Sequence, residues 1–199
     1  MTMPASVAHE ERERELVRAT RTLFDQRGMQ DAPVEEIAKT VGIARGLIYR
    51  QFSSKEELYV LTVTDYLAEL SAAMNDAGPA LDAITEAFAR FCVRYPAFLD
   101  CALRTMRQPA QELNATVSES VWLRLGEGME SCIGPLCDAL RERGVDDPDF
   151  TANVLWTQGL GLMHLARIRV GLRRGPELFA VDEEEVVRRC VENALLLAR

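Results

Sequence analysis

The stretch Gly42–Leu58, GIARGLIYRQFSSKEEL, decides the fold of the N-terminal part of this chain. A short amphipathic segment ends at Gly42, and glycine is the residue that most readily adopts the left-handed conformation of a tight turn. The next segment, Ala44–Phe52, has the helical period and places Ile48 and Phe52 on one packing side. Two helices joined by a tight glycine turn, and braced by a preceding helix, form a helix-turn-helix motif.

The preceding sequence supplies the other two helices of this unit. Residues 10–27 carry apolar side chains at helical spacing and are followed by Gly28, a left-handed cap. A second, short helix is expected to have Pro33 at its first position, where a missing backbone N–H costs nothing, and to end at Gly42.

The charge of the quoted stretch contrasts with that of the whole chain. The net charge is -8, yet residues 40–55 hold three bases and no acid. A helical wheel at roughly 100° per residue places Arg45, Tyr49 and Arg50 on the solvent side of the third helix. Phosphate contacts supply much of the affinity for DNA and base edges the specificity, so a basic surface confined to one helix predicts DNA binding. A solvated helix with ordinary arginines is the weaker alternative.

A fourth helix begins just after this stretch. Ser54 and Glu57 have the spacing of a capping box, and the helix is expected to run to about Asn75. The predicted organisation is a disordered tail at 1–9, a helix-turn-helix domain at 10–54 and a larger domain at 55–199, within which 55–76 is a connecting helix.

Residues 23–59, LFDQRGMQDAPVEEIAKTVGIARGLIYRQFSSKEELY, resemble the DNA-binding domain of the TetR family of bacterial transcriptional regulators. The resemblance implies that the second helix of the motif enters the major groove of DNA. Leu47 stands where threonine is common in the family, and its apolar side chain suits a thymine methyl group. The contacts implied are base edges for Arg45, Gly46 and Leu47 and phosphates for Tyr49, Gln51 and Lys55.

The remainder of the chain also has helical periodicity. Gly78-Pro79 separates the fourth helix from an amphipathic segment at 81–91, and Pro96 interrupts the next helical stretch. A longer helix is expected from about Leu113 to Arg143. Its Gly134-Pro135 pair predicts a kink or a break that opens space between helices.

Two further helices close the chain. Asp147-Pro148 predicts the start of one that runs to about Gly171 and is apolar on nearly every side, while Asp182 and Glu185 predict a capping box for the other. A symmetric dimer, in which both helices pack against their copies as a four-helix bundle, covers this excess of apolar surface, as in the resembled family. The expected interface residues are Phe150, Val154, Leu162, Leu165, Val187, Val191, Ala194 and Leu195.

The larger domain has more adaptable apolar bulk than a tight core requires, because methionine fills irregular space. We therefore expect a pocket for a largely hydrophobic small molecule, with an anionic group near Arg104 or Arg107. Ordinary core packing is the alternative for each apolar residue, and two solvated arginines at a helix C-terminus explain the charges equally well. The candidate pocket residues are Phe88, Phe91, Tyr95, Arg104, Met106, Arg107, Trp122, Met129, Trp156, Met163 and His164.

Other kinds of site have little support. Five cysteines without a C-x-x-C pair and only two histidines, His9 and His164, do not predict a metal site. The cysteines lie among apolar neighbours, which favours buried thiols over a redox sensor. Gly159-x-Gly161 lacks the third glycine and the preceding strand of a dinucleotide site, so no cofactor is expected. No segment is apolar enough to cross a bilayer and no secretory signal is evident, so a cytoplasmic location is expected.

These observations predict an all-α, homodimeric transcriptional regulator. The expected function is a repressor that a small hydrophobic effector releases from a near-palindromic operator in double-stranded DNA. We expect no enzyme activity, because no acid, base and nucleophile converge in the larger domain. The alternative is a helical ligand carrier or enzyme whose N-terminal helices are only structural.

Overall fold

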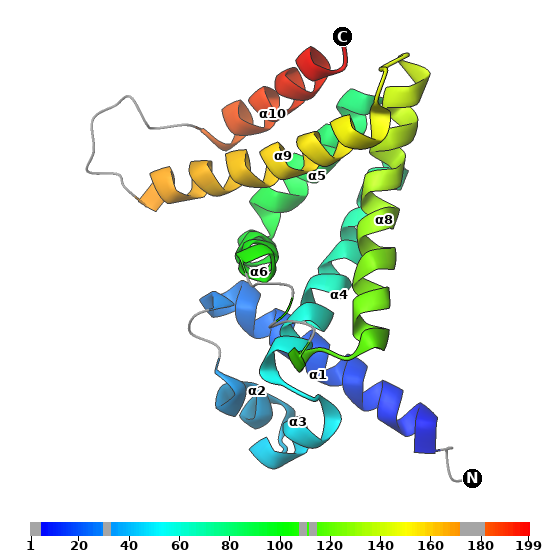
Figure 1. Ribbon diagram of the computed structural model, residues 1–199. Helices are drawn as coiled ribbons and strands as arrows, with labels where there is room; N and C mark the ends of the chain where they lie inside the picture. The colour runs from blue at the N-terminus through cyan, green and yellow to red at the C-terminus, as the bar shows by residue number, and fades with distance from the viewer. Residues whose placement is uncertain (1–4, 30–32, 108–110, 112–114, 172–181) are drawn as a thin grey trace. The chain divides into compact units, whose positions relative to one another are not determined.

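The computed structural model describes residues 5–29, 33–107, 111, 115–171 and 182–199, with backbone only for 5–8 and 167–171 (Figure 1). These residues form α-helices and connecting turns, and no β-strand occurs among them, which confirms the all-α class. None of the helices in these ranges is long and apolar enough to cross a membrane. By internal contacts the chain divides into a first unit, residues 1–66 and 100–126, and a second unit, residues 67–99 and 127–199. The sequence predicts a single boundary at 54/55.

The first unit is built around the predicted helix-turn-helix. It contains α1 (Ala5–Arg27), α2 (Val34–Val41), α3 (Arg45–Gln51), the first part of α4 (Lys55–Asp76), the end of α6 (Pro96–Arg107) and the start of α8 (Glu119–Glu142). Its core joins the apolar faces that periodicity indicates, and its buried side chains include Leu16, Leu23, Phe24, Ile37, Ile48, Phe52 and Leu58.

Two glycines set the path of the chain through this unit. Gly28 ends α1 with φ 79°, and its N–H donates to the carbonyl of Phe24 at 2.8 Å. Gly42 ends α2 with φ 72°, and its N–H donates to the carbonyl of Lys39 at 3.1 Å. Both positions lie in the left-handed region, which a side chain with a Cβ rarely adopts, so the two predicted helix ends are confirmed.

The starts of α1 and α2 differ from expectation. α1 begins at Ala5, so residues 5–9 are helical where the sequence predicts a disordered tail; residues 1–4 lie outside the described ranges. Pro33 is the N-cap residue of α2, with ψ 158°, and does not occupy the first helical position. Its carbonyl accepts the N–H groups of Glu36 and Ile37, which explains why the helix starts one residue later than predicted.

The second unit contains the rest of α4, α5 (Leu81–Arg94), the first turn of α6, the rest of α8, α9 (Pro148–Gly171) and α10 (Glu183–Leu197). α5, α9 and α10 pack against one another and form its core. Asp147 caps α9 as predicted, because its carboxylate accepts the N–H of Phe150 at 3.0 Å. The turn at Gly78, with φ 94°, separates α4 from α5.

The expected helix from Leu113 to Arg143 is shorter at its start. α8 begins at Glu119, and the carbonyl of Ser118 accepts the N–H groups of Val121 and Trp122, as an N-cap residue does; residues 112–114 lie outside the described ranges. The side chain of Ser118 donates to Glu57.

The Gly134-Pro135 pair predicts a kink or a break. α8 continues through Pro135, so the helix is not broken there. A proline has no N–H, so the carbonyl of Ser131, four residues earlier, loses its helical partner. The hydroxyl of Ser71, on α4, donates to that carbonyl at 3.1 Å and satisfies it.

The capping box predicted for α10 is wrong. Asp182 is the N-cap residue, but no side-chain hydrogen bond caps the helix. The carboxylate of Glu185 is instead engaged by the guanidinium groups of Arg188 and Arg189, one turn further along the helix, with Arg189 Nε at 2.5 Å. An arginine partner competes well for a carboxylate because the hydrogen bond is charge-assisted.

Candidate DNA-binding surface and ligand region

α3 turns one face inward and one outward. Ile48 is 1% exposed and anchors the helix in the core of the first unit. The predicted contact residues Arg45, Gly46, Tyr49 and Arg50 are exposed, and Leu47 is half-buried. The structure therefore places these candidate residues on one outward-facing helix; their contacts with DNA stay a prediction.

Arg45 already has partners within the chain. Its Nη1 atom lies 2.6 Å from a carboxylate oxygen of Glu35, on the first turn of α2, and its guanidinium carbon lies 5.6 Å from the centre of the Tyr49 ring. Hydrogen bonding to Tyr49, and then the charge of Glu35, raises the pKa of Arg45 above its usual value. The arginine is thus charged and held beside α2, and no sequence pattern predicts Glu35 as its partner.

Two further candidates lie at the end of α3 and the start of α4. Gln51 donates from Nε2 to the main-chain carbonyl of His9 at 3.1 Å, and the same atom lies 3.1 Å from the His9 ring nitrogen Nε2. Lys55 is half-buried in the first turn of α4, with its Nζ atom 5.0 Å from the centre of the Tyr59 ring. His9 lies in the region predicted to be a tail, so no sequence signal pointed to this contact.

The candidate pocket residues divide between the two units. In the first unit, Arg104 lies 3.8 Å from Glu56, Met106 is 56% exposed, Arg107 is exposed, and Trp122 Nε1 is a buried atom with no hydrogen-bond partner among the described residues. The remaining candidates, Phe88, Phe91, Tyr95, Met129, Trp156, Met163 and His164, belong to the second unit.

Within the second unit, aromatic contacts join some of these side chains. The rings of Phe88 and Trp156 have centres 5.2 Å apart, and Phe91 lies 4.8 Å from Tyr95 by the same measure. Met163 is buried and Met129 half-buried. His164 Nδ1 is buried and has no partner among the described residues.

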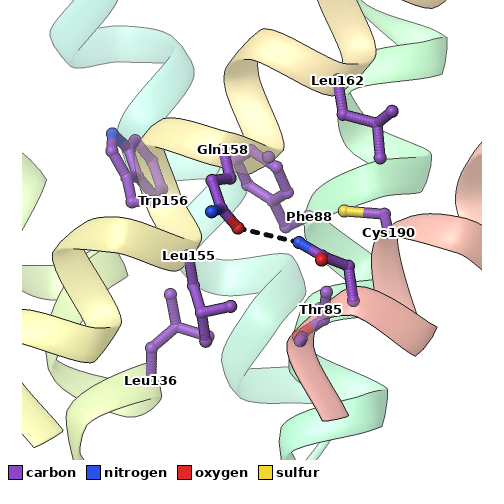
Figure 2. A pocket seen from close by; sticks show the side chains of 11 residues that line it. Thr85, Phe88, Leu136, Leu155, Trp156, Gln158, Leu162 and Cys190 are labelled. Carbon is purple, nitrogen blue, oxygen red and sulfur yellow. Dashed lines mark hydrogen bonds between the residues drawn. The ribbon is translucent and has the colours of Figure 1, made fainter. Parts of the chain in front are cut away.

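A small cavity lies among α5, α8, α9 and α10 (Figure 2). Its volume is about 20 Å³, enough for one water molecule, and Phe88 and Trp156 are the candidate residues in its wall. The side-chain oxygen of Gln158 accepts a hydrogen bond from Asn193 Nδ2 at 2.8 Å, which ties α9 to α10 at the cavity. The described state therefore has no room here for a molecule of effector size.

A larger hollow adjoins Pro135, where the sequence predicts extra space. It has a volume of about 300 Å³. Its wall consists of the end of α4, the α4–α5 turn, α5 and α8, with residues Asn75, Gly78, Pro79, Ile84, Pro135, Asp138, Ala139 and Glu142. Apart from Pro135, no sequence pattern pointed to these wall residues.

The predicted interface residues are of three kinds. Phe150 is 67% exposed and Leu165 43% exposed on α9. Val187 and Ala194 are buried within the chain itself, so both belong to the core of the second unit. The half-buried residues are Val154, Leu162, Val191 and Leu195.

Burial affects the ionisation of the cysteine thiols. It raises the pKa of Cys190 to about 11 and, as the largest effect, that of Cys132 to about 12. Cys92 and Cys101 are buried too. Because the thiolate is the reactive form, these thiols are poor redox sensors at neutral pH. In the described ranges, no group of three His, Cys, Asp or Glu side chains is placed to hold a metal ion.

The family model for bacterial regulatory proteins of the tetR family matches residues 16–61, which contain α2, α3 and the start of α4. Residues 16–61 are therefore similar to the DNA-binding part of TetR-family regulators. The TetR-family match includes every candidate DNA-binding residue, but it does not reach the candidate pocket or interface.

Curated relatives match a part of this chain. The HTH-type transcriptional regulator BetI of Ectopseudomonas mendocina (strain ymp) is 37% identical over 71 residues, which are 36% of this chain and 36% of that protein. PksA of Bacillus subtilis (strain 168) is 36% identical over 56 residues, 28% of this chain and 27% of that protein. The chain therefore spans about a third of the length of these relatives, or less.

Solved structures match along nearly the full length. The regulator PfmR from Thermus thermophilus aligns with a TM-score of 0.61 at 20% identity and covers 100% of this chain and 97% of its own. The fatty acid degradation regulator FadR from Bacillus halodurans gives 0.62 at 13% identity, with 92% and 97% covered. BioQ from Mycobacterium smegmatis gives 0.63 at 17% identity, with 94% and 97% covered. At these identities the likeness shows the shared fold.

Proposed function

We propose that this chain is a DNA-binding transcriptional repressor of the TetR family that works as a homodimer in the cytoplasm and leaves its operator when a small hydrophobic effector binds. The observation that carries the DNA-binding part is the exposed face of α3. Arg45, Tyr49 and Arg50 project from it on a helix whose other face is locked in the core by Ile48. Arginine is the side chain best suited to paired hydrogen bonds with a guanine edge.

DNA binding is tested by selecting bound duplexes from random sequence and measuring their affinity by fluorescence anisotropy. Arg45→Ala should cost about 1–3 kcal/mol of operator affinity if the side chain reads a base. Arg143→Ala, which removes the same charge from an exposed site in the second unit, is the control and should change affinity little. A folded Arg45→Ala protein that binds as well as the wild type overturns the assignment.

The dimer is supported by exposed apolar side chains on α9. Phe150 and Leu165 are 67% and 43% exposed in the single chain, and a second copy would cover them. Leu165→Glu should therefore shift the chain toward monomer in sedimentation at micromolar concentration, while Leu123→Glu, at an exposed apolar site on α8, should not. A wild-type monomer that protects an asymmetric DNA site contradicts the dimer, since two-fold symmetry requires half-sites about 10 bp apart or a multiple of it.

The effector is proposed for the second unit, near the Phe88–Trp156 contact and the buried His164 Nδ1, which has no partner among the described residues. An unpaired buried polar atom is costly, and a ligand that supplies its hydrogen bond gains affinity from this. The cavity holds only a water-sized volume, so effector binding requires the helices around it to separate. DNA and effector would favour different arrangements, with α4 as the connecting helix, and by linkage each weakens binding of the other.

The effector proposal is tested with a library of hydrophobic compounds. An effector should change the fluorescence of Trp156 and lower operator affinity by about 1–3 kcal/mol. Phe88→Leu should alter affinity for that compound while operator binding in its absence survives. A broad library in which no compound shifts operator affinity overturns the effector proposal and leaves DNA binding untouched.

A further inference from the structure

A buried carboxylate ties the start of α4 to a distant segment of the chain. Glu57 is 5% exposed, and its side chain accepts hydrogen bonds from the N–H of Ser118 at 3.2 Å and from the Ser118 hydroxyl. The N–H of Ser53 donates to its other oxygen. Beside it, the Ser54 hydroxyl donates to the carbonyl of Thr116 at 2.6 Å. We call these five residues the Glu57 junction.

The Glu57 junction holds a charge without a basic partner among the described residues. Burial opposes ionisation of Glu57 most strongly, but the hydrogen bonds from Ser118 and Ser53 outweigh it and lower the pKa of Glu57 below its usual value. A buried carboxylate satisfied by neutral donors is stable only where those donors are fixed in place. Segments 61 residues apart in the chain are thus locked together at one point.

The junction lies beside the residue expected to bind a DNA phosphate. Ser54 precedes α4, and its hydroxyl accepts the N–H of Glu57 at 2.9 Å, so the junction fixes the first turn of the helix. Lys55 is part of that turn. Phosphate contacts set the register of a protein on the duplex, so the direction of this turn matters for binding.

We infer that Ser118, acting through Glu57, is a positioning residue for operator binding: it holds the first turn of α4 so that Lys55 meets a DNA phosphate. This inference rests on the proposed DNA-binding function. Residues 116–118 lie outside the matched region 16–61, yet they belong to the first unit. Through the Glu57 junction they hold the first turn of α4, which carries Lys55. Because Ser118 is also the N-cap residue of α8, a shift at the start of α8 alters the Lys55 contact directly.

The test is a double-mutant cycle on the duplex that the wild type selects from random DNA. Ser118→Ala, Lys55→Ala and the double variant are compared by fluorescence anisotropy across a series of salt concentrations. If Ser118 acts by positioning Lys55, Ser118→Ala weakens binding about 5-fold in the wild type and less than about 2-fold when Lys55 is already alanine. Lys55→Ala should also reduce the salt slope by about one unit.

Two controls separate positioning from folding. Ser131→Ala changes an exposed serine further along α8, whose hydroxyl donates to the carbonyl of Gly128, and should leave DNA affinity unchanged. Ser118→Thr keeps the hydroxyl and should bind more tightly than Ser118→Ala. Thermal unfolding of each variant shows that the protein is folded; if Ser118→Ala is not, Glu57→Gln, which retains an acceptor oxygen, takes its place in the cycle.

The outcomes are distinct. Equal losses from Ser118→Ala with and without Lys55, or no loss in the folded variant, overturn the positioning role while the proposed function stands. A wild-type chain that selects no DNA overturns the proposed function, and the positioning role with it.

Discussion

The Nη1 atom of Arg45 lies 2.6 Å from a carboxylate oxygen of Glu35, so the arginine expected to read a base is paired with an acid on the neighbouring helix. Both side chains are more than half exposed, at 59% and 54%. An exposed ion pair of this kind is worth about 0–1 kcal/mol, so a guanine edge can replace Glu35 at small cost. Glu35 thus competes with a guanine edge for the guanidinium of Arg45.

Removing the acid should therefore strengthen DNA binding. Glu35→Gln frees Arg45 and is expected to raise operator affinity by up to about 5-fold, the equivalent of about 1 kcal/mol. Glu36→Gln, which removes the same charge one residue away from an acid paired with Arg27, controls for the general loss of negative charge. The gain should disappear in an Arg45→Ala background. Equal gains from Glu35→Gln and Glu36→Gln would show that the pair itself has no role.

The Glu57 carboxylate predicts a loss of stability in acid. Its pKa is lower in the folded chain than the value of about 4.3 expected when unfolded, so the unfolded chain takes up the proton first as pH falls. The stabilisation is fully present above about pH 4.3 and is lost as pH falls through the folded-state pKa. In urea unfolding at about pH 7 and about pH 3, the stability difference between wild type and Glu57→Gln should shrink at the lower pH. Glu127→Gln, at an exposed site, should show no such trend.

The helix-turn-helix was predictable because its signals are local. Gly28 and Gly42 end helices through a backbone preference, and the inward position of Ile48 follows from helical period alone. The Glu57–Ser118 contact joins segments 61 residues apart, and no periodicity relates them. The sequence also predicts a helix start at Leu113, whereas α8 begins at Glu119, after Ser118.

For the ligand region, the sequence predicts which kinds of side chain are present but not their arrangement. Aromatic and methionine side chains are abundant in the larger domain, but composition does not say which of them meet. Phe88 and Trp156 are in contact, whereas Arg104 and Trp122 belong to the other unit.

The capping box expected at Asp182 and Glu185 does not form, because arginines on the following turn compete for the Glu185 carboxylate.

Pro135 and Ser71 should be coupled in stability. The Ser71 hydroxyl donates to the Ser131 carbonyl that Pro135 leaves without a helical partner. Ser71→Ala should lower the free energy of unfolding by about 0.5–1.5 kcal/mol, because it removes the hydrogen bond to this part-buried acceptor. In a Pro135→Ala background the cost should be smaller, since the substituted residue supplies a backbone N–H to the same carbonyl. The same cost in both backgrounds, measured by urea unfolding, would refute the coupling.

Gly159 and Gly161 lie on the same helix, α9, yet alanine should affect the two positions in opposite ways. A Cβ at Gly159 would lie 2.7 Å from Cε1 of Phe88, whereas a Cβ at Gly161 would meet no atom within 4 Å. Phe88 is 4% exposed and packs against Trp156, so it cannot easily move aside. Gly159→Ala should therefore destabilise the chain by about 1–3 kcal/mol through overpacking.

At the exposed Gly161 the backbone effect should dominate. Gly161→Ala should stabilise the chain by up to about 1 kcal/mol, the difference in helix propensity between the two residues. The smaller side chain in Phe88→Leu should recover part of the stability lost in Gly159→Ala, because it removes the atom that the new Cβ meets. If alanine at both glycines raises the urea midpoint equally, α9 does not approach α5 as closely as the Gly159–Phe88 contact requires.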